Sequence, residues 1–298
     1  MADLRAATRG SPLALWQTRH VAGRLDHPVE EVVVSTVGDR RTDVPIHTMG
    51  GKGVFVKEVQ AAVLYGRADF AVHSGKDLPA ETPDGLVLVA VPSRADARDA
   101  LVGAAWADLP TGARVATGSV RRRAQLAWHR PDLVFSELRG NIQTRLGKLE
   151  SDGYDAIVMA AAAIDRLELD LTVTVDRLDP SVMVPQVAQG ALAIECRADD
   201  ADAIAALAAI EDADTRRVVD AERAFLSELG GDCDLPAGAH AVLAPDNSIE
   251  MVGMLSSLDG RVLIRERRTG ADPDALGRGI ARHLLDDAGG TDLLADTR

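Results

Sequence analysis

Short apolar runs alternate with stretches of helical periodicity over the first third of the chain. Apolar residues recur at helical spacing in Val54–Tyr65. Ser11 followed by Pro12 predicts a helix start, because serine caps helix N-termini and proline fits the first helical turn. Four apolar runs predict strands: Leu4–Ala7, Val32–Ser35, Asp69–Val72 and Leu86–Val91. This alternation predicts a mostly parallel sheet covered by helices.

The same pattern begins again near residue 96. Three more strands are expected, at Arg114–Ala116, Leu133–Leu138 and Asp155–Ala160. Helices are expected between them, at Ser119–His129 and Asn141–Glu150. The second stretch therefore predicts a second α/β domain.

The chain changes character from about residue 213. The pattern predicts a helix at Thr215–Leu229, strands at Ala239–Leu243 and Ser248–Leu255, and a last helix at Leu276–Asp287. These elements indicate a small α+β domain at the C-terminus. The expected fold class is thus α/β, with two α/β domains and a small third domain. The glycine-bearing stretch Arg40–Gly53 is the expected mobile loop.

Charge and composition narrow the classes of function. The net charge of −13 and the 3% of aromatic residues argue against a nucleic-acid-binding module. No apolar run approaches the roughly 18–20 residues of a membrane span, and Met1–Arg9 contains no apolar signal segment. We therefore expect a cytoplasmic protein without a membrane partner. The two cysteines, Cys196 and Cys233, lack histidines at ligand spacing, so no metal site is expected.

Arginines gather where predicted strands meet predicted helices. Arg121 and Arg122 lie at a helix start, where the helix dipole slightly disfavours cations. Arg9 and Arg139 end strands, and Arg145 lies one turn into the next helix. Strand ends of open α/β sheets face a ligand crevice, and arginine suits carboxylates and phosphates. Any one of these arginines could be a solvated surface residue, but together they predict a ligand with several acidic groups.

Three further residues have both a chemical and a structural interpretation. Asp77 follows a strand and could stabilise a cation or move protons, or it could simply cap the turn before Pro79. Lys76 could equally be a surface lysine. Cys233 follows two glycines and could be a nucleophile or an idle thiol, whereas Cys196 follows an apolar run and is assigned to structure.

Six segments together resemble the porphobilinogen deaminase family. The resemblance rests on segments that occur in the family's order between residue 4 and about residue 240. They are Ala7–Gln17, Thr36–Asp39, Gly51–Glu58, Val72–Pro79, Leu138–Leu146 and Gln189–Cys196. This ordered set is far more specific than any single motif.

The resemblance implies a fold and a reaction. The first two domains would be arranged like a two-lobed periplasmic solute-binding protein. Their bounds would be residues 1–92 with 189–209 for the first, 96–184 for the second and 213–298 for the third. The enzyme would be a transferase of haem and tetrapyrrole biosynthesis, and a monomer. It would add four porphobilinogens head to tail to a dipyrromethane cofactor, release ammonia at each addition, and finally release hydroxymethylbilane.

The resemblance also implies roles for individual residues. Asp77 would be catalytic and would stabilise the azafulvene cation that forms when ammonia leaves. Each porphobilinogen carries an acetate and a propionate, so basic residues and hydroxyls would bind a polyanion. The cofactor would be bound by Cys233 (through a thioether), Lys76, Arg121, Arg122, Ser119, Thr117 and Ser74. The substrate would be bound by Arg9, Ser11, Arg139, Arg145, Arg166 and Phe55.

The chain departs from the family's usual pattern at four positions. Gly118 stands where a serine hydroxyl is usual, and Asp232 where a glycine usually precedes the cofactor cysteine. Ala163 and Ala188 also replace common glycines. Two other functions share the expected fold: a two-lobed anion-binding protein that needs no Cys233, and a deaminase-derived protein that has lost activity.

Overall fold

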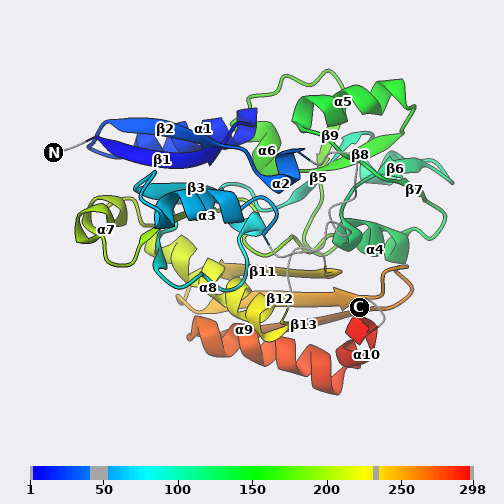
Figure 1. The fold of residues 1–298 in the computed structure, drawn as a ribbon. Helices are drawn as coiled ribbons and strands as arrows, with labels where there is room; N and C mark the ends of the chain where they lie inside the picture. Colours follow the sequence, from blue (N-terminus) through cyan, green and yellow to red (C-terminus); the bar gives the residue numbers. More distant parts are fainter. Residues whose placement is uncertain (1–2, 41–52, 231–234, 296–298) are drawn as a thin grey trace.

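Three sheets form the structure, a computed structural model that describes residues 3–40, 53–230 and 235–295 (Figure 1). Two of the sheets have five strands each, and the third has three. The expected loop at Arg40–Gly53 lies largely outside the described residues, and Cys233 lies outside them entirely. Within the described ranges, no helix is both long and apolar enough to cross a membrane.

The first sheet has the strand order β2-β1-β3-β10-β4. Its strands are β1 (Leu4–Arg9), β2 (Val29–Val34), β3 (Phe70–Ser74), β4 (Leu86–Ala90) and β10 (Leu192–Arg197). β1 pairs in parallel with β2 and β3, whereas β10 runs antiparallel to β3 and β4. Three helices cover the sheet: α1 (Pro12–Ala22), α3 (Lys57–Leu64) and α7 (Ala201–Ala208). A short helix, α2 (Val37–Arg40), follows the end of β2.

Side-chain alternation along β1 explains why helices lie on both faces. Ala6 belongs to a core cluster with Val21 of α1 and Leu207 of α7. Its neighbour Ala7 belongs to a different cluster with Val59 of α3. Successive side chains of a strand point to opposite faces, so this short apolar strand needs cover on each side.

The second sheet repeats this arrangement, with the order β7-β6-β8-β5-β9. Its strands are β5 (Asp99–Gly103), β6 (Arg114–Ala116), β7 (Val134–Ser136), β8 (Ala156–Ala160) and β9 (Thr174–Arg177). β6 pairs in parallel with β7 and β8, and β5 runs antiparallel to β8 and β9. The helices of this unit are α4 (Val120–His129), α5 (Ile142–Ser151) and α6 (Ala161–Arg166), and a short 3-10 turn, η3, spans Trp106–Asp108.

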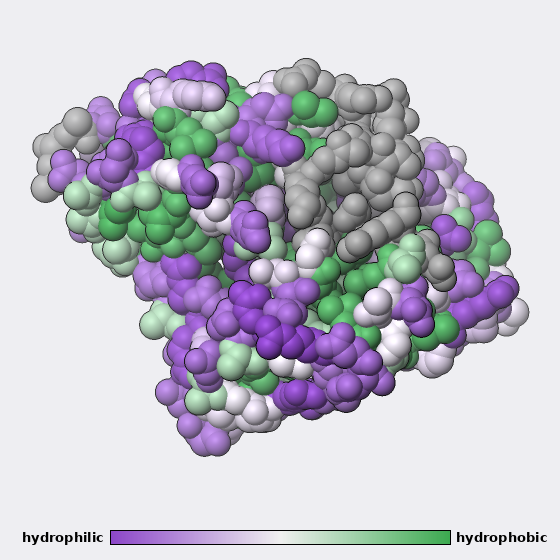
Figure 2. All heavy atoms as spheres, turned by 60° about the horizontal axis from the view of Figure 1, so that its bottom comes forward, coloured by the Kyte–Doolittle hydropathy of each residue, from purple (hydrophilic) through white to green (hydrophobic). Residues whose placement is uncertain are grey.

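The third sheet is an antiparallel meander of β11 (Ala237–Leu243), β12 (Ile249–Ser256) and β13 (Leu263–Gly270). Helices α8 (Ala213–Glu228) and α9 (Pro273–Arg282) pack against each other and against this sheet. A π-helical turn, η4 (His283–Asp287), and α10 (Gly290–Ala295) follow. The core of this unit includes Phe225, Leu255 and Ile280. Figure 2 brings its outer face forward and shows it as largely hydrophilic.

Two segments, residues 91–98 and 185–191, connect the first two sheets. They contact each other where the Ala95 N–H donates to the Gly190 carbonyl at 3.1 Å. Gly190 has φ +87°, and a Cβ there would lie 2.6 Å from the Ala95 oxygen, so the crossing requires glycine. The third unit packs onto these connectors, because its core also contains Val91 and Val187.

The predicted fold class is confirmed: two α/β units precede a small α+β unit. The expectation of a mostly parallel sheet holds for four strands of each five-stranded sheet, but β10 and β5 run against the others. The predicted helix at Val54–Tyr65 begins only at Lys57, and the one at Leu276–Asp287 begins earlier, at Pro273, where Asp272 caps it.

Candidate active site

A cavity of about 920 Å³ is lined by residues of both α/β units. The segments that follow the carboxyl ends of β1, β2 and β3 form one wall, and those after β6, β7 and β8 form the other. Open α/β sheets place ligand sites at such strand ends. The sequence-based expectation of a crevice at these ends is therefore confirmed.

Three of the helices that begin at the cavity have a side-chain cap: α1, α4 and α5. The Ser11 hydroxyl accepts the Ala14 N–H at 3.3 Å, and the Ser119 hydroxyl accepts the Arg122 N–H at 3.4 Å. Asn141 caps α5. Helix N-termini carry partial positive charge, and a capping hydroxyl can still donate its own proton. All three helix starts therefore favour an anion in the cavity.

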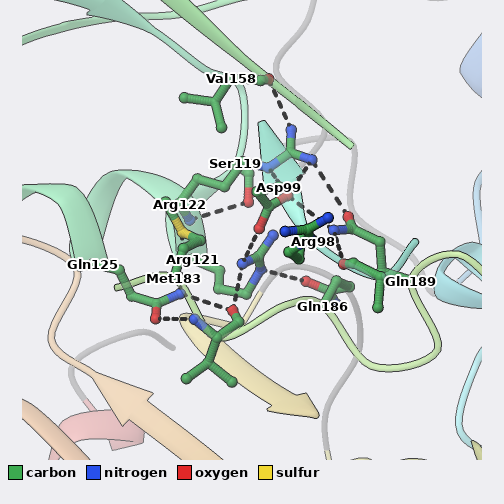
Figure 3. Close-up of polar contacts among 12 residues, drawn as sticks. Arg98, Asp99, Ser119, Arg121, Arg122, Gln125, Val158, Met183, Gln186 and Gln189 are labelled. Atoms are coloured by element: carbon green, nitrogen blue, oxygen red, sulfur yellow. Dashed lines mark hydrogen bonds and ion pairs between the residues drawn. The ribbon is translucent and has the colours of Figure 1, made fainter. Parts of the chain in front are cut away.

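Arg121 and Arg122 converge on a buried carboxylate at the base of the cavity (Figure 3). The Asp99 side chain is fully buried, and its two oxygens lie 2.8 Å from Nη1 of Arg121 and 2.9 Å from Nε of Arg122. Burial alone would raise the pKa of Asp99, but the two arginines hold it well below its usual range. Burial lowers the pKa of Arg121. The cluster therefore contains two cations and one anion.

Asp99 was not identified as a site residue from the sequence. It is the first residue of β5, a strand that the apolar pattern did not predict. The apolar run of this strand is short and directly follows charged residues, so it was not recognised as a strand. The sequence did contain one indication of this pair. An aspartate begins a short apolar run, and two adjacent arginines elsewhere in the chain had no predicted acidic partner.

Gln189 joins the two walls of the cavity. Its amide donates to the Ala97 carbonyl at 2.7 Å and to Asp99 at 3.0 Å. Its side-chain oxygen accepts from Arg122 and from the Lys76 amine, each at 3.4 Å. Gln189 lies in the second connector, so the connector, β5 and the turn after β3 share one polar network.

Lys76 and Asp77 lie in a 3-10 turn, η2 (Gly75–Asp77), directly after β3. Both line the cavity. Burial and the nearby Arg122 lower the pKa of Lys76 to about 8, although Asp77 and Asp99 act in the opposite direction. Asp77 and Arg145 are also within electrostatic range of each other. Asp77 thus lies in the cavity wall close to Lys76 and Arg145, a position that leaves its role as a catalytic group or a turn residue to be tested.

Arg9 has both an ionic and an aromatic partner. Its Nε lies 3.1 Å from the Asp39 carboxylate, and its guanidinium lies 4.2 Å from the centre of the Phe55 ring. Burial would raise the pKa of Asp39, but Arg9 and Thr36 lower it overall. Asp39 is a second cavity carboxylate that was not singled out from the sequence.

Arg139 and Arg145 lie on the opposite wall, after β7. Nε of Arg145 donates to the Gly140 carbonyl at 2.8 Å. Burial, together with Arg122 and Arg139, lowers the pKa of Arg145 to about 10. Gly140 has φ +115°, and a Cβ there would lie 2.6 Å from Thr144, so glycine is needed where the chain turns into α5.

The remaining predicted site residues lie outside the cavity wall or outside the described residues. Ser74 ends β3, and Thr117 is buried with its hydroxyl accepting the Ser119 N–H at 3.2 Å. Neither lines the cavity, nor does Arg166, whose guanidinium donates to the Gly190 carbonyl. Cys196 is buried, and burial raises the pKa of its thiol to about 11, which agrees with its structural assignment.

The described wall of the cavity carries more positive than negative charge, although the whole chain is acidic. Two carboxylates line it, Asp39 and Asp77. Six cationic side chains line it: Arg9, Lys76, Arg121, Arg122, Arg139 and Arg145. Such a cavity can hold a ligand with several carboxylates and keep one aspartate beside it. No cluster of potential metal ligands occurs among the described residues.

Comparisons with solved structures give only remote similarities. An ancestral cationic amino acid solute-binding protein aligns with a TM-score of 0.44 at 15% identity, over 69% of this chain and 86% of that one. The VFT2 domain of BvgS from Bordetella pertussis aligns with a TM-score of 0.42 at 14% identity, over 74% of this chain and 91% of that one.

Comparisons with known sequences are much closer. The model of the porphobilinogen deaminase dipyrromethane cofactor-binding domain matches residues 4–205, and that of the porphobilinogen deaminase C-terminal domain matches residues 217–286. The porphobilinogen deaminase of Brevibacillus brevis is 44% identical, over 99% of this chain and 98% of its own length. That of Roseiflexus castenholzii is 46% identical, over 98% and 99%. The chain belongs to the porphobilinogen deaminase family.

Proposed function

We propose that this cavity binds porphobilinogen and the family's dipyrromethane cofactor through their carboxylates, and that Asp77 serves the chemical step. The observation that carries the proposal is the surplus of six cations over two carboxylates, Asp39 and Asp77, where both sheets end. A polyanion would be attracted to such a site, and the rest of the acidic chain would repel it.

The residues at the base of the cavity suit the cofactor. Arg121 and Arg122 would bind its acidic side chains, with Lys76 and Ser119 nearby. Thr117, whose hydroxyl accepts the Ser119 N–H, would support that helix start, and Ser74, directly before η2, would add a further hydroxyl. Arg122 donates to Gln189 only at 3.4 Å, so a ligand carboxylate could replace that weak bond. When bound, the dipyrromethane supplies the terminal pyrrole carbon to which substrate units are added.

Incoming substrate would contact the walls above this base. Arg9, Arg139 and Arg145 would bind the acetate and propionate of porphobilinogen, and Ser11 would donate a neutral hydrogen bond. Phe55 already packs on the Arg9 guanidinium and would limit how that side chain turns. Arg166 instead contacts Gly190 and Trp16, away from the cavity wall.

Asp77 would act on the charge that appears when substrate loses ammonia. The remaining pyrrole carries a positive charge, and a fixed carboxylate in a cavity stabilises that charge without rearranging water. The same carboxylate could accept the proton released when the new carbon–carbon bond forms. Lys76 would meanwhile hold cofactor carboxylates, and Arg145 substrate carboxylates, away from Asp77.

We also propose that the cofactor is attached through Cys233, which lies between the end of α8 and the start of β11. The predicted domain bounds belong to the same proposal: residues 1–92 with 189–209, then 96–184, then 213–298. The strands of each sheet fall within these ranges. Because one chain supplies both walls of the cavity, a monomer is the simplest functional unit. That it acts in the cytoplasm is part of the same proposal.

Intact mass measurement tests the attachment. Protein made in cells that synthesise porphobilinogen should carry a dipyrromethane adduct, and Cys233→Ser should fold without the adduct or turnover, since a hydroxyl is a much poorer nucleophile than a thiolate. Cys196→Ser is the matched control and should keep both. A bare mass for the parent protein, or an adduct on Cys233→Ser, would overturn the proposed attachment.

A further inference from the structure

Arg166 joins three parts of the molecule although it lies outside the cavity wall. It is the last residue of α6 in the second unit, and its side chain is almost completely buried. Its Nη2 donates to the Gly190 carbonyl of the second connector at 2.7 Å. Its guanidinium also lies 5.8 Å from the ring centre of Trp16, on α1 of the first unit.

The aromatic partner is itself held in place. Trp16 stacks on His20 one turn later in α1, with ring centres 4.8 Å apart and planes 13° from parallel. Burial, together with Arg24 and Arg166, lowers the pKa of His20, which favours its uncharged form. The stack therefore presents a fixed, neutral aromatic face to the guanidinium, the arrangement that favours a cation–π contact.

One contact of Arg166 is at the connectors, and the other is away from them. Gly190 belongs to a connector and is bonded to the other connector through Ala95, so it lies where the two units are joined. Trp16 belongs to the first unit, and α1 packs against α6 across the gap between the units (Figure 1). Because Gly190 lies where the connectors cross, a rotation about them would displace it little, whereas the same rotation would separate Trp16 from Arg166.

That rotation would change the width of the cavity. The segment just before α1, which includes Arg9, Gly10 and Ser11, lines the cavity, and so do Ala163 and Leu167 beside Arg166. Separating α1 from α6 would move these two walls apart. A cavity that receives one substrate unit after another has to gain room as the bound chain lengthens.

We propose that the Arg166–Trp16 contact is a latch between the two α/β units, which holds the cavity closed and opens as the bound pyrrole chain grows. The latch itself is independent of the proposed function; only its release during elongation rests on that function. Arg166 is then a positioning residue that sets the aperture of the cavity.

Fluorine NMR of the cofactor-bearing protein labelled with 5-fluorotryptophan tests the latch directly. The chain has three tryptophans, so the Trp16 resonance can be assigned by its loss in Trp16→Leu. Arg166→Met should shift the closed-to-open ratio at Trp16 about two- to fivefold toward open before any substrate is added. Arg166→Lys, which keeps the cation, should restore much of the closed state. The resonance of Trp128, on the exposed side of α4, should not change.

Small-angle X-ray scattering supplies a second readout, with Trp128→Leu as the control for Trp16→Leu. Trp16→Leu and Arg166→Met should each increase the radius of gyration, and the double variant should be no more open than either single one. If the double variant were more open than either single one, the two side chains would act independently and the latch would be wrong. If Arg166→Met left the Trp16 resonance unchanged but raised KM, the latch would also be wrong, and Arg166 would be assigned to substrate binding. If the free protein opens as expected but added porphobilinogen does not shift Trp16 further, the release step is wrong.

Discussion

Charged residues of the cavity wall have specific partners, and the clearest case is the buried Asp99, which pairs with Arg121 and Arg122 at the base of the cavity. Both of its oxygens meet arginines in a place without solvent access. Removing one member of a buried ion network leaves the others uncompensated, at a cost of about 3–5 kcal/mol. Asp99 therefore holds Arg121 and Arg122 in place as well as reducing their net charge.

Asp99→Asn should lower the free energy of unfolding by about 3–5 kcal/mol in urea denaturation at neutral pH. The folded-state pKa of Asp99 lies below the unfolded value of about 3.9. Its stabilising contribution is therefore fully present above about pH 5 and is lost as pH falls through the folded value. The difference in stability between parent and variant should shrink in acid. Asp132→Asn, at a partly exposed pair with Arg130, should have little effect; an equal loss there would refute a special role for Asp99.

Lys76 predicts a pH dependence of cofactor capture. In the cofactor-free protein its pKa of about 8 means that this positive charge is lost as pH rises through about 8. The rate at which the cofactor-free protein takes up its dipyrromethane should therefore fall on the alkaline side near pH 8, since the cofactor carboxylates that would raise this pKa are not yet bound. Lys76→Arg should move that fall to higher pH, because arginine stays charged. The exposed Lys57→Arg is the control, and a fall that stays near pH 8 in Lys76→Arg would exclude Lys76 as its cause.

At the scale of elements, the junction between β6 and α4 is packed tightly against the segment that follows β7. A Cβ at Gly118 would lie 2.7 Å from the Leu138 carbonyl and 3.0 Å from the Glu137 carboxylate. Glycine at this position therefore permits a close approach of two backbone segments. The missing side chain, seen in the sequence as a departure from the family pattern, leaves room for this close approach.

Gly118→Ala should destabilise the protein by about 1–3 kcal/mol, because the backbone carbonyl of Leu138 cannot easily move away. Gly147→Ala is the matched control: Gly147 is exposed in α5, and a Cβ added there would have no neighbour within 4 Å. That substitution should stabilise by about 0.5–1 kcal/mol. Thermal denaturation of the two variants would show whether close packing or helix propensity dominates; a Gly118→Ala protein as stable as the parent would contradict the packing argument.

The elements also show how far the sequence pattern could predict the fold. Apolar runs such as Ala156–Ala160 and capped helix starts such as Ser119 follow from local residue types, and both are found in the structure. Strand direction is not encoded locally, so the antiparallel course of β5 and β10 could not be predicted from periodicity. Arg121 and Asp99 are 22 positions apart in the sequence, and Asp99 lies in a strand that the pattern did not predict. For this reason Asp99 could not be identified from the sequence as the partner of Arg121.

At the scale of the whole molecule, the third unit is bonded to both of the connectors that join the two similar sheets. Glu222 of α8 is fully buried and bonds Arg94 of the first connector at 2.7 Å. The same carboxylate accepts the Ala188 N–H of the second connector at 2.7 Å. The third unit is thus fixed to both connectors, and Ala188, at φ +55°, keeps a conformation in which glycine would be less strained. These contacts hold the connectors in place at the point where the two α/β units, and so the two walls of the cavity, come together.

Asp77→Asn bears most directly on the proposed chemistry, because it keeps size and most hydrogen bonding and removes only the charge. Single-turnover elongation, followed by intact mass of the covalent species, should show a protein that folds and retains its pyrrole chain. Each addition should be about 10²–10³ slower than in the parent. The exposed Asp84→Asn should elongate normally. Elongation of Asp77→Asn within a few-fold of the parent would contradict a catalytic role and leave Asp77 as a turn residue.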